Sequence, residues 1–340
     1  MVILDFLTAI LILLFYLMIG KIDMVPLMAI TMIILCGIQG TYQPAVQASI
    51  PVLVETKQIM KGNSVVNLIS SLAGMVGPII GGVLFSFIGL TPILYISIGC
   101  FFAAAVMEIF IHIPFEKKQA SGNILVIGFN DLKDSFHFML KEKPALWKMS
   151  LVYAAVNLFL TSLILIGIPV IITQHLEFDA DTANRFYGYA MGGIAAGAIS
   201  GGLLAGILSK KLKLKTSPIL LIGCTLSVLA GGIALQMLSR PVGIYIILVV
   251  GSSLLTALST LFQIQVLTYL QTVTPKDLIG KVISCVICIC VCTNPIGQFI
   301  YGIIFEKLEN GLYLPFYAAA LIMIGIIVLT RRIFYDLDRN

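Results

Sequence analysis

Long apolar runs with few charged residues constrain this chain more than any other feature. Ten runs lie near or above the roughly 20 residues that an α-helix needs to cross a bilayer. Of the 340 residues, 59% are hydrophobic and 11% are charged, whereas soluble domains carry roughly 25% charged residues. A water-soluble fold would have to bury every run, so we predict an all-α membrane protein. The predicted spans are Val2–Gly20, Met24–Val46, Val65–Ile88, Thr91–Ile113, Leu151–Thr173, Tyr187–Leu208, Ser217–Leu238, Gly243–Leu270, Val282–Phe305 and Tyr313–Thr330.

The basic residues between the spans predict the orientation. An even number of spans places both termini on one side, and 17 of the 21 Lys and Arg residues fall there. The opposite side holds Lys21, Arg185, Arg240 and Lys307. Because basic residues concentrate in cytoplasmic loops, both termini are predicted to be cytoplasmic in a multi-pass protein of the plasma membrane. The net charge of +5 thus reflects topology, and no nucleic-acid partner is predicted.

A glycine- and proline-rich segment interrupts the apolar run Val65–Ile88. Pro78 has no N–H to donate, and small residues let another helix approach closely, as in a bendable transporter helix. A Gly-rich packing face in any polytopic protein is the alternative. The predicted conformational motif in this run consists of Gly74, Gly77, Pro78, Gly81 and Gly82.

The segment has a second copy near the C-terminus. Gly62 precedes Pro78 by 16 residues, and Gly280 precedes Pro295, which Gly297 follows, by 15 residues. Internal duplication is common in transporters whose halves rock about a midplane site. Chance matching of short Gly/Pro patterns is the alternative. We add Pro295 and Gly297 to the conformational motif.

The repeat predicts two unequal halves. Four spans precede the polar segment Phe115–Lys148 and six follow it. The predicted domains are an N-terminal half at 1–114, a cytoplasmic linker at 115–148 and a C-terminal half at 149–340. The chain is therefore expected to be a twelve-helix protein without its first two helices.

Three motifs resemble the major facilitator superfamily, and within it the drug and macrolide exporter branch. Residues 73–82 resemble the antiporter motif of the fifth helix, with Ala73 in place of its first glycine. The stretch 43–54 resembles the end of the fourth helix, and 202–206 followed by two lysines resembles a loop signature. The resemblance implies a helical bundle that exports a hydrophobic or amphipathic compound by alternating access, with proton antiport. The family also carries this loop signature in its first half, and that copy is absent here. No arginine lies near Cys36, where the family has one for proton coupling.

Three ionisable residues in the spans are candidate proton-titrating groups, since intramembrane charges are costly. Asp5 lies in the first turn of its span, where it could instead complement a helix N-terminus. Glu108 and His112 lie four residues apart on one helix face, and an interfacial, snorkelling pair is the alternative.

Uncharged amides are predicted to line a substrate cavity, because they supply donors and acceptors without ionic cost. Together with Phe, Met and Tyr side chains, they suit bulky, partly apolar ligands. Helix–helix hydrogen bonding is the alternative for any single amide. The candidates are Gln39, Gln43, Gln47, Asn67, Asn157, Gln263, Gln265, Asn294 and Gln298.

A group of four cysteines is not expected to bind a metal. Cys285, Cys288, Cys290 and Cys292 lie in an apolar helix without an acid or histidine, so they are interpreted as packing residues. The linker is predicted to form an amphipathic helix along the cytoplasmic surface, as a tether or a regulatory docking site. Its apolar face would contain Phe129, Leu132, Phe136, Met139 and Leu140, opposite Asp131, Lys133, Asp134 and His137.

The predicted function is secondary active transport. No P-loop, metal cluster or nucleophile–base pattern appears in the sequence, so neither ATP, a cofactor nor enzymatic catalysis is expected. The expected partners are a small-molecule substrate and membrane lipid, with H⁺ as candidate coupling ion. The alternatives are a nutrient importer or uniporter of the same fold, and a truncated membrane protein that does not transport.

Overall fold

The computed structural model describes residues 1–110, 133–209, 212, 214–275, 278–308 and 311–336. These residues form helices and contain no β-structure beyond one isolated bridge. The predicted all-α fold is confirmed. The helices are α1 (Val2–Met18), α2 (Met24–Leu53), α3 (Ile59–Ile88), α4 (Leu90–Ile109), α6 (Pro144–Ala155), α7 (Ser162–Val170), α8 (Ala180–Ile207), α9 (Ser217–Met237), α10 (Pro241–Val273), α11 (Ile279–Lys307) and α12 (Leu314–Asp336). The short 3₁₀ and π segments are η1 (Thr56–Gln58), η2 (Phe138–Glu142), η3 (Val156–Thr161), η4 (Ile171–His175) and η5 (Leu214–Thr216).

Every predicted span overlaps a helix, with boundaries that differ by a few residues. The span predicted at Leu151–Thr173 is one rod built from α6, η3, α7 and η4. Within the described part of the chain, seven helical segments are long and apolar enough to cross a membrane. Two further apolar helices, Val2–Met18 and Leu314–Thr330, are shorter.

The helices group into two compact units. Unit 1 comprises Met1–Glu55 and Ala73–Ser121, and unit 2 comprises Thr56–Leu72 and Gly122–Asn340. The division passes through α3, so its first part belongs to unit 2 and its Gly/Pro motif belongs to unit 1. The domain boundaries predicted at residues 114 and 148 stay predictions.

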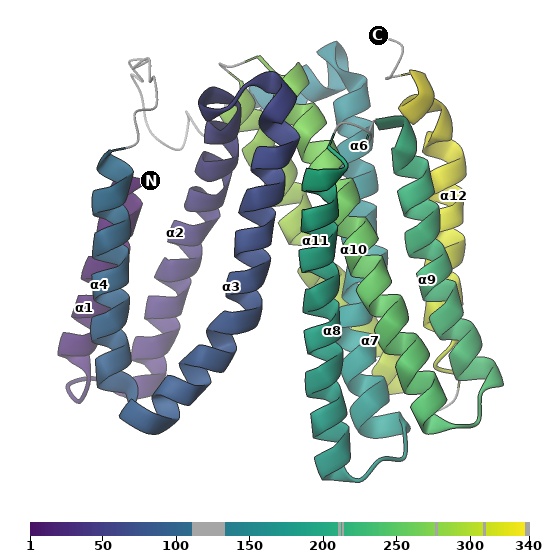
Figure 1. Ribbon diagram of the computed structural model, residues 1–340, viewed down its shortest axis with the longest axis horizontal. Coiled ribbons are helices and arrows are strands. Elements are labelled where there is room, and N and C mark those ends of the chain that lie inside the picture. Colours follow the sequence, from purple (N-terminus) through teal and green to yellow (C-terminus); the bar gives the residue numbers. More distant parts are fainter. Residues whose placement is uncertain (111–132, 210–211, 213, 276–277, 309–310, 337–340) are drawn as a thin grey trace. The chain divides into compact units, whose positions relative to one another are not determined.

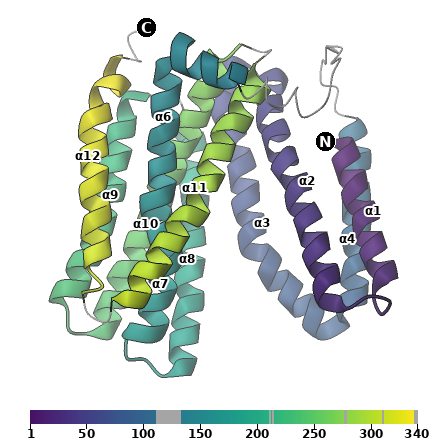
Figure 2. The same ribbon diagram turned by 180° about the vertical axis from the view of Figure 1, so that it is seen from behind.

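In unit 1, α1 runs antiparallel along α4 (Figures 1 and 2). Aromatic pairs join the two helices near both ends: the ring centroids of Phe6 and Phe102 are 5.5 Å apart, and those of Tyr16 and Tyr95 are 5.0 Å apart. Gly89 connects α3 to α4 in a single residue with φ of 73°. A side chain would strain this left-handed conformation, so glycine allows the sharp reversal.

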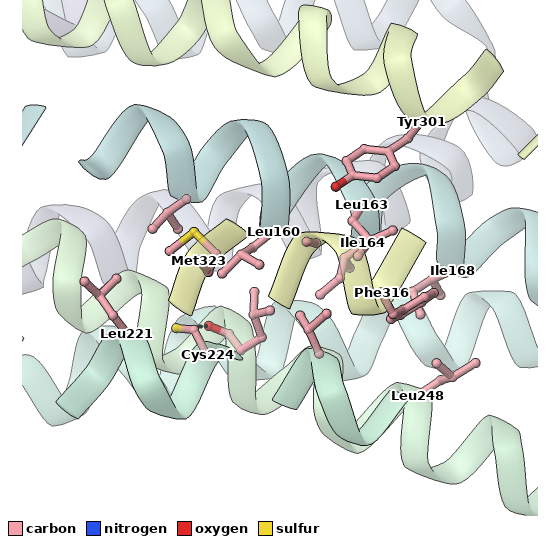
Figure 3. Close-up of a cluster of buried hydrophobic side chains, with 14 of the residues drawn as sticks. Leu160, Leu163, Ile164, Ile168, Leu221, Cys224, Leu248, Tyr301, Phe316 and Met323 are labelled. Carbon is pink, nitrogen blue, oxygen red and sulfur yellow. Dashed lines mark hydrogen bonds between the residues drawn. The ribbon is translucent and has the colours of Figure 1, made fainter. Parts of the chain in front are cut away.

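Unit 2 has one large hydrophobic core (Figure 3). Leu163 of α7, Leu221 of α9, Leu248 of α10 and Met323 of α12 are all at most 2% exposed. Tyr301 of α11 joins the same cluster. The rod from Pro144 to His175 contacts α8, α10, α11 and α12.

Helices α8 and α10 approach almost to backbone contact. A Cβ added at Gly197 would lie 3.0 Å from the Cα of Ser253, and closer still to its carbonyl oxygen. A Cβ added at Gly201 would meet the backbone of Ala257 in the same way, and one added at Gly193 would meet the side chains of Val249 and Ser253. Three glycines at a spacing of four residues share one face of α8, the arrangement that allows close helix packing in membranes.

The described end of the linker corrects part of the predicted apolar face. Met139 is fully buried, whereas Leu140 is 48% exposed. The prediction used the 3.6-residue period of an α-helix, whereas residues Phe138–Glu142 form the π segment η2. Because a π turn is wider, Leu140 leaves the predicted apolar face. Asp134 is exposed as predicted and forms a 3.7 Å ion pair with Lys281. Phe129, Asp131 and Leu132 lie outside the described residues.

Candidate functional site

Two of the predicted proton-titrating residues are found together in unit 1. Asp5 lies in the first turn of α1, and Glu108 lies in the last turn of the antiparallel helix α4. Electrostatic interaction links the two carboxyl groups. The third candidate, His112, lies outside the described residues, so its pairing with Glu108 stays a prediction.

Tyr42 of α2 completes this group and was not predicted. Its hydroxyl donates a 2.7 Å hydrogen bond to Oε1 of Glu108. The other oxygen, Oε2, is buried and has no hydrogen-bond partner among the described residues. Asp5 is 6% exposed, so it is not a solvated residue at a helix end. We refer to Asp5, Tyr42 and Glu108 as the carboxyl cluster.

A second polar group lies in unit 2, where η3 and α7 meet α11. The Ser162 hydroxyl lies 2.9 Å from the carbonyl oxygen of Asn157, to which it donates. It also lies 3.2 Å from the carbonyl oxygen of Asn294 and 3.4 Å from its Oδ1. Of the two predicted amides, only the Asn294 side chain approaches this hydroxyl, because the Asn157 side chain donates to the Tyr153 carbonyl oxygen at 3.0 Å.

The π segment η3 explains why backbone carbonyls are available at this place. A π turn breaks the regular ladder of backbone hydrogen bonds, and such turns are frequent at functional sites. The Tyr301 hydroxyl donates a 2.9 Å hydrogen bond to the carbonyl of Phe159. A Cβ added at Gly297 would lie 2.5 Å from the Leu158 carbonyl oxygen and 2.5 Å from Ser162 Oγ. Glycine is therefore required where α11 crosses η3, two residues after Pro295.

The first copy of the conformational motif differs from the second. Among the described residues, a Cβ added at Gly74, Gly77 or Gly81 would meet no heavy atom within 4 Å beyond the neighbouring backbone of α3. Pro78 and Gly82 continue the helix without a break. Close approach of another helix is thus seen at Gly297 of unit 2, whereas for the three glycines of α3 in unit 1 it stays a prediction.

The remaining predicted amides are dispersed. Gln265 is 1% exposed, accepts from the Ser217 hydroxyl at 2.9 Å and donates to Thr216 Oγ1 at 2.9 Å. It therefore joins α9 to α10, the alternative that the sequence left open. The structure leaves Gln39 and Gln43 exposed on α2, and Gln47, Asn67, Gln263 and Gln298 half-buried.

A further amide was missed by the sequence analysis. Asn63 is 2% exposed, and its Nδ2 donates to Gln271 Oε1 at 2.6 Å and to Thr268 Oγ1 at 3.0 Å. It lies just before the predicted span Val65–Ile88, so it was not considered as an intramembrane residue. Beside it, Ser64 and Asn67 face Gly206 and Gly202 of α8. These contacts join the first part of α3 to α8 and α10.

Comparisons with known proteins now identify the family. A family profile described as "Major Facilitator Superfamily" matches residues 1–292 of the chain. The chain belongs to the major facilitator superfamily. Members of this family are transporters that sit in membranes and bind small-molecule substrates; they are not enzymes. The predicted fold is confirmed, and secondary transport is supported as the general function.

Solved structures agree with the family assignment. A crystal structure of a bacterial homologue of the iron transporter ferroportin, in an outward-facing state, has a TM-score of 0.67 and 16% identity, covering 100% of this chain and 82% of that chain. The structure of such a homologue with soaked iron has a TM-score of 0.63 and 17% identity, covering 100% and 81%. At these identities the similarity concerns the fold alone. No curated protein sequence matches the chain.

Proposed function

We propose that this transporter of the major facilitator superfamily exports a hydrophobic or amphipathic small molecule across the plasma membrane, in exchange for protons. The proposal rests on uncharged amide side chains that lie in helices without charged residues. No charged residue lies between Met149 and Gln174 or between Pro241 and Val273. Asn157 and Gln263 lie within these stretches, and a charged substrate would find no ionic partner there.

The amides and their surroundings suit a ligand with apolar surface and a few polar atoms. An amide both donates and accepts hydrogen bonds, while Phe, Met and Tyr side chains contact apolar surface. Asn294 and Gln298 of α11 are half-buried, so they are partly accessible. The concentration of basic residues in alternate loops supports cytoplasmic termini, and the resemblance of residues 73–82 to an antiporter motif supports export.

A transport assay in everted membrane vesicles tests the proposal. Vesicles that contain the full chain should accumulate a lipophilic compound from a panel of drugs and macrolides when their interior is acidic, and lose it when the pH gradient is collapsed. Ferrous iron is included because the similar structures are homologues of an iron transporter. Accumulation of iron alone, or uptake only by right-side-out vesicles, would contradict the proposal.

The open flank of the α3 motif is proposed to accept a helix in another state of the transport cycle. Gly77→Leu should leave the insertion and folding of the protein intact, because a side chain finds space at this position. It should reduce export by blocking the approach of that helix. Gly99→Leu in α4, where an added Cβ also meets no described heavy atom within 4 Å, is the matched control. Equal export by both variants would refute a role for Gly77 in the cycle.

A further inference from the structure

The described end of the linker, residues 133–143, has one buried and one exposed face. Met139 is fully buried and Phe138 is 3% exposed. Leu140 is 48% exposed, and Lys141 beside it is exposed as well. The apolar face of this segment therefore packs on the protein, while its outward face carries basic residues and one leucine.

Two contacts hold this segment against the first turns of α6 and α11. The ring centroids of Phe136 and Trp147 lie 5.4 Å apart, and Trp147 belongs to the first turn of α6. Asp134 forms its 3.7 Å ion pair with Lys281, in the first turn of α11. The chain therefore folds back between Phe136 and Trp147, at the end of unit 2 where α6 begins (Figure 2).

This turn carries more positive than negative charge. Its two acids are Asp134, which the ion pair with Lys281 neutralises, and Glu142. Four exposed lysines lie in the same stretch, and none of them forms an ion pair within the described residues. We refer to these lysines together with Leu140 and Trp147 as the basic patch. The lysines are Lys133, Lys141, Lys143 and Lys148.

The length of the rod that follows indicates that the basic patch lies at the level of lipid headgroups. The rod from Pro144 to His175 has 32 residues. At 1.5 Å per residue it is about 48 Å long, whereas the hydrocarbon core of a bilayer is about 30 Å thick. Its first turn therefore extends beyond the core. Trp147, the only tryptophan of the chain, lies on this turn and is half-buried, and the amphipathic ring of tryptophan favours the headgroup level.

We propose that the basic patch binds the headgroup of an anionic phospholipid, with Leu140 in contact with its acyl chains. The stem of a lysine side chain is apolar, so it lies along lipid while its ammonium group reaches the phosphate. Attraction to an anionic membrane surface is worth about fivefold in affinity for each lysine. A zwitterionic lipid has no net charge and lacks this advantage. The proposal concerns a lipid neighbour of the protein and does not depend on which compound is transported.

The fluorescence of Trp147 tests the proposal, because no other tryptophan contributes to the signal. The full chain is placed in phosphatidylcholine nanodiscs in which a fixed fraction of the lipid carries bromine, a quencher, on its acyl chains near the headgroup. Brominated phosphatidylglycerol should quench Trp147 more strongly than brominated phosphatidylcholine at the same fraction. Added NaCl should reduce this difference, because salt screens exposed charges.

A triple variant locates the binding site. Lys141→Gln, Lys143→Gln and Lys148→Gln together should lower the preference for phosphatidylglycerol by about fivefold per lysine. The matched control removes three exposed basic residues from the opposite end of unit 2 and should keep the preference. Its changes are Arg185→Gln, Arg240→Gln and Lys307→Gln. All six side chains are exposed, so both variants should fold.

Equal quenching of the wild type by the two lipids would overturn the proposal, as would an unchanged preference in the lysine variant. Loss of the preference in the control variant would also overturn it, since net charge alone would then attract the lipid. Inorganic phosphate, added at constant ionic strength, distinguishes a free anion from a headgroup. An unchanged preference supports the lipid, whereas loss of the preference would assign the patch to phosphate ions and overturn the proposal.

Discussion

The contact between α8 and α10 makes a prediction with an internal control. Gly197→Ala adds a Cβ 3.0 Å from Ser253 Cα and closer still to its carbonyl oxygen, whereas ordinary contacts begin at 3.4 Å. The obstacle is backbone, so the two helices must separate along their length. Overpacking of this kind costs about 1–3 kcal/mol. Alanine also gains about 0.5–1 kcal/mol over glycine in a helix interior, which partly offsets the loss.

Gly192→Ala, on the same helix, isolates the packing effect. A Cβ at Gly192 meets no described heavy atom within 4 Å, so this variant gains only the higher helix propensity of alanine. The difference between the two variants therefore removes the helix propensity and should be about 1–3 kcal/mol in unfolding free energy. Equilibrium unfolding in mixed lipid–detergent micelles, followed by circular dichroism, measures it. Equal stability of the two variants would refute backbone contact between α8 and α10.

Three other sites give predictions of the same kind. Gly297→Ala should lower stability by about 1–3 kcal/mol relative to Gly302→Ala, where a Cβ meets no atom of the described residues within 4 Å, in the same unfolding assay. Asn63→Ala should cost about 1–3 kcal/mol and speed hydrogen exchange in the first turns of α3, whereas Ser284→Ala, at an exposed serine, should not. Hydrogen bonds from the Thr182 hydroxyl and N–H lower the pKa of Asp179, the N-cap of α8, below its ordinary value of 3.8. Ionised Asp179 thus stabilises the first turn of α8 above that pH, and the stabilisation is lost as the pH falls through the lowered pKa. Amide exchange at Thr182 should show this loss on acidification, and Asp179→Asn should abolish the pH dependence.

The sequence predicted the helices well because span length and apolar composition are local properties. It did not predict the π segments, since η3 has no composition that distinguishes it from an ordinary apolar helix. The spacing of Gly193, Gly197 and Gly201 is visible in the sequence, but the backbone they approach on α10 is not.

The candidate sites show the same limit. Asp5 and Glu108 were identified one by one from the cost of charge in a membrane. Their association depends on the antiparallel pairing of α1 with α4, which residue spacing does not reveal. Asn63 was missed because a polar residue at the edge of an apolar run resembles a loop residue.

The π turn in η3 also determines where this span can change length. Deleting one residue from an ordinary helix such as α7 turns everything beyond the deletion by about 100°, because each residue occupies that angle. Deleting one between Val156 and Thr161 would instead let the wide turn close to a regular one, and the side chains of α7 would keep their directions. The loss would fall on the carbonyl groups that Ser162 and Tyr301 bind. The wide turn therefore contributes polar contacts with α11, while the direction of the rest of the span does not depend on it.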